Sequence, residues 1–501
     1  YTYNYLDKHN LKIMLGLSFQ KDQSFNNKGK AMNGPNDKIH YVGAGWGGAN
    51  GLNNTGTAAD PFYVSAFDYS SGFSEERMNS YFGRLTYNYK EKYLFEATLR
   101  RDGSSVFGED VRWATFPSIA VGWTFSDEKF MKPFYWLSFG KIRASWGVSG
   151  QKFSQRYLSQ GLLSANGTTF HGDIAMFPDI RGGVINKKLS WEETNQYDLG
   201  FDLSFLDYRL RLVIDYYYRY TKGQLNQISL PGDIYYHQFQ WQNGMAISNQ
   251  GLELELEADI LRHTAVKWKM KFNASRNWNR FEKSADGFDF MEQVIGKPLH
   301  QIKVFKTDGF YNSLDEVPVY YLANKEVQPL YSGITAGIYL PGSRRLVDLN
   351  GDGRITEDAD VYFAESPLPL AHGGFINQLR WKNFDLNIFF NYSLGRHIVK
   401  VYDDVSMTAN GSAKPLFVDV NDVKIWTEAG SKADYPKSQV YAYLMNQTSG
   451  RYDCDIESVS FLRLKQLTLG YNVGERVLNK LKISGARIFV TGENLFLLTN
   501  Y

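Results

Sequence analysis

The sequence predicts an all-β chain, folded as an antiparallel β-barrel that spans a membrane. Three observations predict it: apolar and polar residues that alternate with a period of two, an aromatic content of 16%, and short turns that alternate with long loops along the chain. Alternating strands can present one face to lipid and the other to water. Aromatic residues favour strands and the boundary between membrane and water.

The strongest alternation lies at residues 252–272. The apolar members are Leu252, Leu254, Leu256, Ala258, Val266, Trp268, Met270 and Phe272, and charged residues stand between most of them. A three-residue turn at 261–263 predicts that Glu257 faces Lys267. The same register places Glu255 opposite Lys269 and Glu253 opposite Lys271. Opposite charges in directly opposed positions stabilise a strand pair by about 0.2–1 kcal/mol.

Three further hairpins show the same pattern. They cover residues 81–99, 197–218 and 375–392, with turns expected at 90–92, 206–208 and 382–383. In the second of these hairpins the apolar positions run from Tyr197 to Phe205 and from Leu210 to Tyr218. Charged side chains occupy the other face of its second strand, namely Arg209, Arg211, Asp215 and Arg219.

The connections differ systematically in length. Tight turns are expected near 7–10, 90–92, 206–208, 261–263 and 382–383, and longer ones near 126–137 and 473–482. Between them lie stretches rich in Gly, Asn, Ser, Asp and Pro, at 21–78, 102–112, 149–190, 222–248, 278–370 and 395–459. Outer-membrane barrels have short periplasmic turns and long extracellular loops. The pattern therefore predicts fourteen strands in seven hairpins.

The composition excludes several classes. A net charge of +2 argues against a nucleic-acid partner, and the single cysteine, Cys454, excludes a disulfide framework within the chain. A soluble propeller should repeat every 40–50 residues or so, and no such repeat is visible. No metalloprotease, nucleophile-elbow or phosphate-loop motif occurs, so an enzyme is not expected.

Several stretches resemble one family of proteins. The clearest are Ser80–Tyr89 and Tyr93–Ser105, which continue through Phe107-Gly108, Arg112-Trp113, Phe116-Pro117-Ser118 and Gly122-Trp123. Later ones are Trp191–Gly200, Asn249–Glu255, Asp348–Thr356, Phe461–Tyr471 and Thr491–Phe496. In this order they resemble the SusC/RagA-like TonB-dependent outer-membrane transporters, and they extend from about residue 80 to the last residues of the chain.

The resemblance implies a 22-stranded barrel closed around an N-terminal plug. On that count, residues 1–501 form one barrel domain that is a fragment, without the plug, the first seven strands and the last strand. It also implies import of an oligosaccharide or oligopeptide across the outer membrane. TonB would supply the energy through the plug, a SusD-like surface lipoprotein would close the barrel, and two such pairs could form a dimer.

Three other functions stay open on the sequence. One is a TonB-dependent receptor for a siderophore, haem or cobalamin, which would lack the lipoprotein, and the stretch Ser80–Ser105 argues against it. The second is a passive porin or a structural surface barrel. The third is a soluble carbohydrate-binding β-protein.

One loop has the spacing of a calcium site. Asp348, Asn350 and Asp352 stand at positions one, three and five, and Arg354 at position seven would offer its carbonyl. Position twelve is Ala359, flanked by Asp358 and Asp360, so the closing carboxylate departs from the usual loop. We expect a bound Ca²⁺ to stiffen an extracellular loop. The alternative is a loop whose Asx side chains bond their own backbone.

Weaker candidates concern the substrate. The loop aromatics Tyr235, Tyr236, Phe239 and Trp241 could stack on sugar rings, or they could pack one loop against another. The inward charges could contact the plug or the substrate, but such rows are more often solvated or mutually paired.

Overall fold

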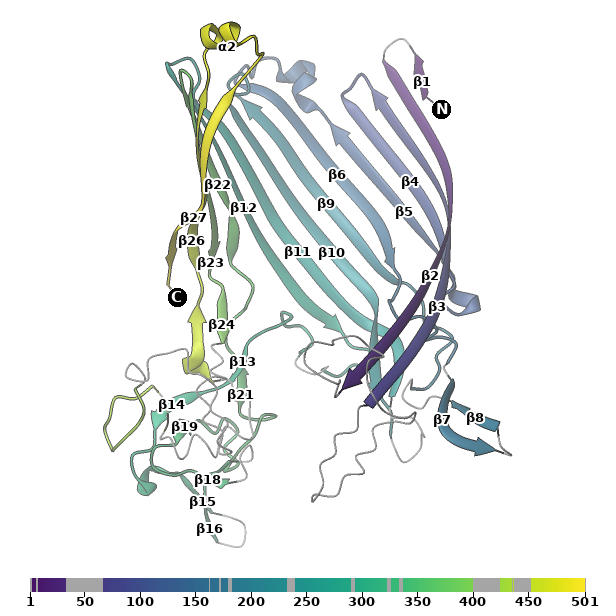
Figure 1. Cartoon of the computed structure of the whole chain (residues 1–501), viewed down its shortest axis with the longest axis vertical. Coiled ribbons are helices and arrows are strands. Elements are labelled where there is room, and N and C mark those ends of the chain that lie inside the picture. The colour runs from purple at the N-terminus through teal and green to yellow at the C-terminus, as the bar shows by residue number, and fades with distance from the viewer. Residues whose placement is uncertain are drawn as a thin grey trace.

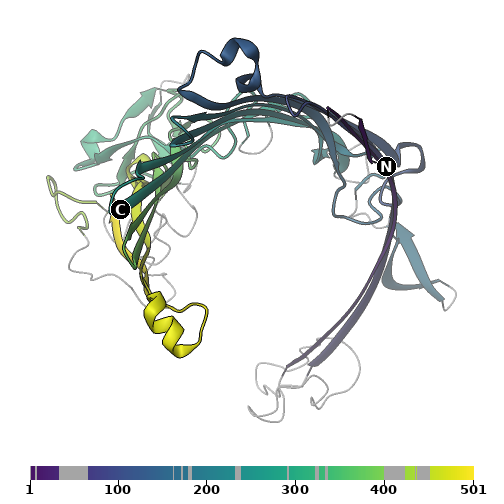
Figure 2. The same ribbon diagram turned by 90° about the horizontal axis from the view of Figure 1, so that it is seen from above.

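The fold is one large antiparallel sheet in which every strand pairs with the next. The computed structural model describes residues 2–5, 8–32, 66–161, 163–170, 173–178, 183–231, 239–289, 293–321, 326–332, 337–399, 424–434, 436 and 452–500. The sheet has fourteen strands, in the order β1-β2-β3-β4-β5-β6-β9-β10-β11-β12-β22-β23-β26-β27. Figure 1 shows these strands side by side, and Figure 2 shows that the sheet curves into an arc. The predicted number of strands and their antiparallel order are confirmed.

The first half of the sheet contains β1 (Thr2–Tyr5), β2 (His9–Met32), β3 (Ala66–Tyr89), β4 (Tyr93–Ser104), β5 (Trp113–Trp123), β6 (Leu137–Gln151) and β9 (Glu192–Phe205). The second half contains β10 (Leu210–Ser229), β11 (Phe239–Leu261), β12 (Val266–Lys283), β22 (Ala371–Trp381), β23 (Phe384–Leu394), β26 (Phe461–Asn472) and β27 (Arg487–Thr499). The one α-helix among the described residues, α2 (Glu475–Leu481), lies in the connection between β26 and β27. None of the described helices is long and apolar enough to cross a membrane.

The predicted hairpins pair largely as expected. Tyr89 lies opposite Tyr93, Phe205 opposite Leu210 and Trp381 opposite Phe384. The hairpin at 252–272 is the exception, because Glu257 lies opposite Lys271 and not Lys267. Its turn spans residues 262–265, one residue longer than predicted, and the pairing shifts between Asp259 and Leu261. The slip is an even number of residues, so every side chain keeps its predicted face.

Several strands are longer than predicted. β2 and β3 have 24 residues each and β11 has 23, so much of the expected loops 21–78 and 222–248 is strand. The sequence misled because polar side chains occupy both faces of these outer segments, as at Gln20–Gln23, and the apolar alternation stops. Backbone pairing continues beyond the point where lipid contact ends, since the ladder needs no apolar face.

The two faces of the sheet differ in chemistry. We call the face that carries Arg143 and Glu257 the charged face, and the opposite one, which carries Leu252–Ala258 at every second position, the apolar face. On the apolar face of β12, Trp268 and Trp278 stand ten positions apart. At about 3.4 Å per residue and a tilt of about 40°, they span about 26 Å. This matches the roughly 25 Å apolar band between the aromatic girdles of membrane barrels.

The long β12–β22 connection, residues 284–370, is folded and not irregular as predicted. It contains β13 (Lys303–Phe305), β14 (Thr307–Phe310), β15 (Val319–Tyr321), β16 (Val327–Pro329), β17 (Tyr331–Ser332), β18 (Gly337–Ile338), β19 (Arg344–Leu346), β20 (Arg354–Ile355) and β21 (Val361–Phe363). Its core consists of Phe305, Tyr311, Val317, Leu330, Tyr339, Leu346 and Ile355. We call residues 302–363 the loop subdomain, and Figure 1 shows it beyond the outer ends of β22–β24 (β24, His397–Val399).

Candidate functional site: the charged face and the outer loops

An ion-pair network joins three strands on the charged face. Arg143 on β6 donates from Nε to Asp202 on β9 at 2.8 Å and from Nη2 to Asp215 on β10 at 2.9 Å. Gly200 lies between the partners, and a Cβ placed there would lie 2.3 Å from the Asp215 carboxylate. The sequence indicated Asp215 but missed Arg143 and Asp202. Their alternation in strands 137–151 and 192–205 was the available signal.

Beside this network the charged face is hollowed. The hollow measures about 430 Å³ and its polar walls include Glu96, Lys141, Arg143, Ser145 and Asp198. Small residues such as Ala120 and Gly122 form its floor, because they leave space between the long side chains around them. The arrangement offers donors and acceptors of both charges to a polar solute. It contains hydrogen-bonding groups in number and suits reversible binding.

The predicted charged row lies on this face, with partners that differ from those expected. Glu257 pairs with both Lys269 and Lys271. Glu253 and Glu255 lie opposite Ser275 and Asn273 instead of lysines.

At the other end of the row Lys267 lies opposite Arg380 and Arg211 lies opposite Glu257. Arg209 donates to the backbone carbonyl oxygens of Asp259 and Ile260 at 2.9 and 2.6 Å. Arg209 therefore holds a turn together and belongs to the structure of the hairpin.

At the outer end of the sheet, the loops after β4, β6 and β10 share one core. Its buried members are Val106, Phe107, Phe116, Phe153, Leu189 and Trp191. Trp191 donates from its indole nitrogen to the carbonyl of Arg112 at 3.1 Å. Three connections that are distant in sequence thus form a single packed layer, which the sequence did not predict.

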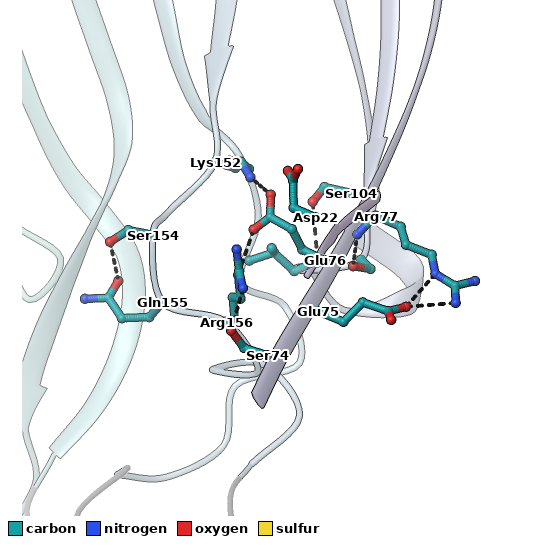
Figure 3. A network of polar contacts seen from close by, with 12 residues as sticks. Asp22, Ser74, Glu75, Glu76, Arg77, Ser104, Lys152, Ser154, Gln155 and Arg156 are labelled. Carbon is teal, nitrogen blue, oxygen red and sulfur yellow. Dashed lines mark hydrogen bonds and ion pairs between the residues drawn. The ribbon is translucent and has the colours of Figure 1, made fainter. Parts of the chain in front are cut away.

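A buried carboxylate attaches this layer to β3. Glu76 is only 7% exposed and forms ion pairs with Lys152 and Arg156, which follow β6 (Figure 3). Arg156 also donates to the hydroxyl of Ser74 at 2.5 Å. The next residue, Tyr157, accepts the amide N–H of Glu75 at 2.8 Å. We call residues 152–157 the latch segment, because these contacts fix it against β3.

The calcium-like loop is ordered by its own backbone. Asp348 accepts the amides of Gly351 and Gly353 at 2.7 and 2.8 Å, and Asn350 and Asp352 each accept an amide two residues further on. Burial alone would raise the pKa of the Asp348 carboxyl. Hydrogen bonds from the Gly353 amide, the Tyr320 hydroxyl and the Gly351 amide outweigh it and hold that pKa below its ordinary value.

The closing residues of this loop divide in role. Asp360 is fully buried and accepts the amides of Leu349 and Thr356 at 2.9 and 2.7 Å, whereas Asp358 is exposed. Arg354 places its guanidinium over the ring of Tyr331. Among the described residues, no three His, Cys, Asp or Glu side chains are grouped as a metal site would require. The geometry fits the Asx-turn alternative, and a bound Ca²⁺ stays a prediction.

The predicted aromatic candidates separate into two groups. Tyr235 and Tyr236 lie outside the described residues. Phe239 and Trp241 belong to β11, with ring centroids 6.3 Å apart. Trp241 packs against the core of the outer loops. For Trp241 the structure thus shows the packing role that the sequence left as an alternative, and ligand contact by either residue stays a prediction.

The comparison with known proteins agrees with this geometry. Residues 1–412 match the family described as "TonB dependent receptor-like, beta-barrel". The chain belongs to this family. It is therefore a β-barrel protein of the outer membrane, and the fold and the location predicted from the sequence are confirmed. In such a barrel the apolar face meets lipid and the charged face lines the lumen.

Relatives of this TonB-dependent barrel carry related names. TonB-dependent receptor P3 of Formosa agariphila is 31% identical over 508 residues, which cover 100% of this chain and 47% of that protein. TonB-dependent receptor SusC of Bacteroides thetaiotaomicron is 28% identical over 431 residues, covering 84% of this chain and 40% of SusC. The chain spans about half the length of these relatives.

A solved structure shares the fold. The structure of the RagAB peptide transporter superimposes with a TM-score of 0.75 at 21% identity, covering 100% of this chain and 51% of that one. The resemblance to SusC and RagA noted in the sequence is thereby confirmed at the level of family and fold.

Proposed function

We propose that this chain is the barrel of an active importer for oligosaccharides or oligopeptides. The observation that carries the proposal is the charged face, where Arg143, Asp202 and Asp215 border a hollow of about 430 Å³. A lumen wall rich in donors and acceptors of both charges suits polar oligomers, whose hydroxyl and amide groups need partners when they leave water. The names of the relatives, SusC and RagAB peptide transporter, support the same class of substrate.

We propose that binding and gating perform the whole function, with no chemical step on the substrate. The energy would come from the proton gradient through TonB, which acts on the plug of such receptors. The ion pairs of the lumen wall would then be exchanged for contacts with the moving plug or with cargo.

A SusD-like lipoprotein is the proposed partner at the outer end. The hairpin of β15 and β16 in the loop subdomain exposes Val319, Tyr321 and Val327, of which Tyr321 is 77% exposed. Adjacent apolar side chains on an outer hairpin are typical of a surface that another protein covers. A dimer of transporter–lipoprotein pairs would be compatible with this position.

We also propose that Ca²⁺ binds the loop at 348–360 and stiffens the loop subdomain. The loop offers oxygen ligands of the kind that Ca²⁺ prefers, from Asp348, Asn350 and Asp352. Ile355, which is fully buried, links this loop to the core of the subdomain. A cation held there would lower the mobility of the surface offered to the lipoprotein.

The experiment that tests import is depletion of defined mixtures from the medium. Cells with the intact gene, cells lacking it and cells lacking TonB are each given labelled oligosaccharides and oligopeptides. We expect one class to be consumed only when both the gene and TonB are present. Consumption that needs the gene but not TonB would instead indicate a passive porin. Growth dependence on a siderophore, haem or cobalamin alone would overturn the nutrient class.

A further inference from the structure

The apolar face of β10–β12 ends, on its outer side, in a group of cations. Arg276, Arg280 and Lys283 lie on β12 and Lys222 lies on β10. Opposed residues share a face, and Arg276 lies opposite Leu252 while Arg280 lies opposite Ser248. Lys283 and Lys222 both lie opposite Ala246. The four cations therefore continue the lipid-facing column of Leu252–Ala258.

The cations stand just outside the outer aromatic girdle. Arg276 places its guanidinium over the ring of Trp278, 4.7 Å from the centroid. Lys283 is five positions beyond Trp278, which at about 3.4 Å per residue and a tilt of about 40° places it about 13 Å further from the membrane centre. This is the level of lipid headgroups, immediately beyond the apolar band.

A hollow opens at this level on the same face. It measures about 410 Å³, and its walls include Trp191, Glu193, Tyr220, Lys222 and Lys283. Aromatic rings with polar tips and flexible cations are the groups that contact sugars and phosphates. The hollow is thus continuous with the surface that touches lipid and is separate from the charged face of the lumen.

The charges in this patch do not cancel. Lys222 pairs with Glu193 at 2.9 Å, and Arg280 lies 3.8 Å from Glu282. Lys283 forms no ion pair with any residue that the structure describes. Four cations against two carboxylates leave a net charge of +2 in the patch. On β2 and β3, by contrast, Lys21 and Arg77 share the carboxylate of Glu75, so the excess is particular to β10–β12.

We propose that this patch, Lys222, Arg276, Arg280 and Lys283, binds the phosphate-bearing headgroup of a glycolipid in the outer leaflet. Its acyl chains would lie along the apolar face of β10–β12, and its sugar would enter the hollow beside Tyr220. Two features support this occupant over a protein: continuity with the lipid-facing band, and an excess positive charge at headgroup height. Cations at this position are stabilised by anionic lipid.

The test is native mass spectrometry of the full-length protein in mild detergent, titrated with bisphosphorylated lipid A. We expect retention of one lipid per chain. The double variant Arg280→Gln/Lys283→Gln should bind about 25-fold more weakly, because each cation beside anionic lipid contributes about 1 kcal/mol and 1.4 kcal/mol is a factor of ten. A conservative double variant, Arg280→Lys/Lys283→Arg, should retain the lipid and shows that the fold is intact.

A matched control removes two cations at the other end of the barrel, as Lys129→Gln/Lys132→Gln, and should bind like the native protein. Lipid A without phosphate should bind as weakly to the native protein as phosphorylated lipid does to the double variant. Equal retention of the dephosphorylated lipid would overturn the proposal, as would unchanged binding by Arg280→Gln/Lys283→Gln. Complete displacement by inorganic phosphate at equal concentration would show that free phosphate, and not a lipid, is the ligand.

Discussion

At the scale of single residues, Gly200 is the position where a missing side chain makes the site. Its Cβ would lie 2.3 Å from Asp215 Oδ1 and 2.7 Å from Arg143 Nη2, so any larger residue must displace the ion pairs. We expect Gly200→Ala to lower the free energy of unfolding by about 1–3 kcal/mol, the usual cost of overpacking. Thermal unfolding in detergent measures it, with Gly485→Ala, where the added Cβ meets nothing within 4 Å, as the control. Equal stability of the two variants would contradict the close approach.

The hydroxyl of Tyr311 is buried without a hydrogen bond to any described residue. Removing an unsatisfied buried group relieves a cost of about 1–3 kcal/mol, so Tyr311→Phe should stabilise the loop subdomain. The control is Tyr321→Phe at the exposed tip, which should change nothing. Proteolysis of the loop subdomain at rising temperature measures both, and faster cleavage of Tyr311→Phe would contradict the assignment.

The same tyrosine predicts a dependence on alkaline pH. Burial raises the pKa of Tyr311 to about 12, above its ordinary value near 10. A raised pKa means that the contribution of this group to stability is complete below pH 10 or so and is lost as the pH rises toward 12. Ultraviolet titration of tyrosinate should show one late group in the native protein that is absent from Tyr311→Phe. Its presence in the variant would assign the late group elsewhere.

At the scale of elements, the contact of Glu76 with Lys152 and Arg156 determines whether the latch segment stays on β3. Glu76→Gln leaves two cations with reduced pairing, and we expect a loss of about 1–3 kcal/mol, confined to residues 152–157. Hydrogen exchange should show faster exchange in this segment, with the membrane strands unchanged. Glu109→Gln, an exposed carboxylate on the neighbouring loop, is the matched control and should leave exchange unaltered. Unchanged exchange in Glu76→Gln would show that the latch contributes nothing.

The loop at 348–360 should weaken in acid. The pKa of Asp348 is lowered, so its contribution to stability is present above the ordinary pKa near 3.9 and is lost as the pH falls below it. Cleavage of the loop should therefore accelerate in acid, and Asp348→Asn should show this fast cleavage already at neutral pH. Asp358→Asn, at an exposed position, should cleave at the native rate. If Ca²⁺ binds, it should slow cleavage of the native loop but not that of Asp348→Asn.

Element boundaries and elements differ in how far the sequence predicts them. Hairpins such as Tyr87–Phe95 were predictable because each apolar residue repeats at two positions and the turn between them is short. The register at Glu257 was not, since it depends on one extra turn residue and an irregular pairing near Asp259. The network around Arg143 was missed because it joins three strands, and a single sequence does not state which strands are neighbours until the order of the sheet is known. The loop subdomain was missed because its strands are only two to four residues long.

At the scale of the whole molecule, the charged face and the apolar face place the chain in the outer membrane, and the outer loops form two folded bodies above it. One is the packed layer around Trp191 and the other is the loop subdomain around Ile355. These rigid surfaces, together with the exposed hairpin at Tyr321, are where a lipoprotein would dock. The central claim is that the barrel works with such a partner to import polar oligomers.

The most direct test is purification of the native protein from outer membranes in mild detergent, with mass spectrometry of everything that accompanies it. The account predicts a SusD-like lipoprotein in stoichiometric amount, together with bound oligosaccharide or oligopeptide. Substitution of Val319, Tyr321 and Val327 by serine should reduce recovery of the lipoprotein while the barrel remains folded. A folded native barrel that emerges alone, with no lipoprotein and no oligomer, would contradict the claim and favour a single receptor.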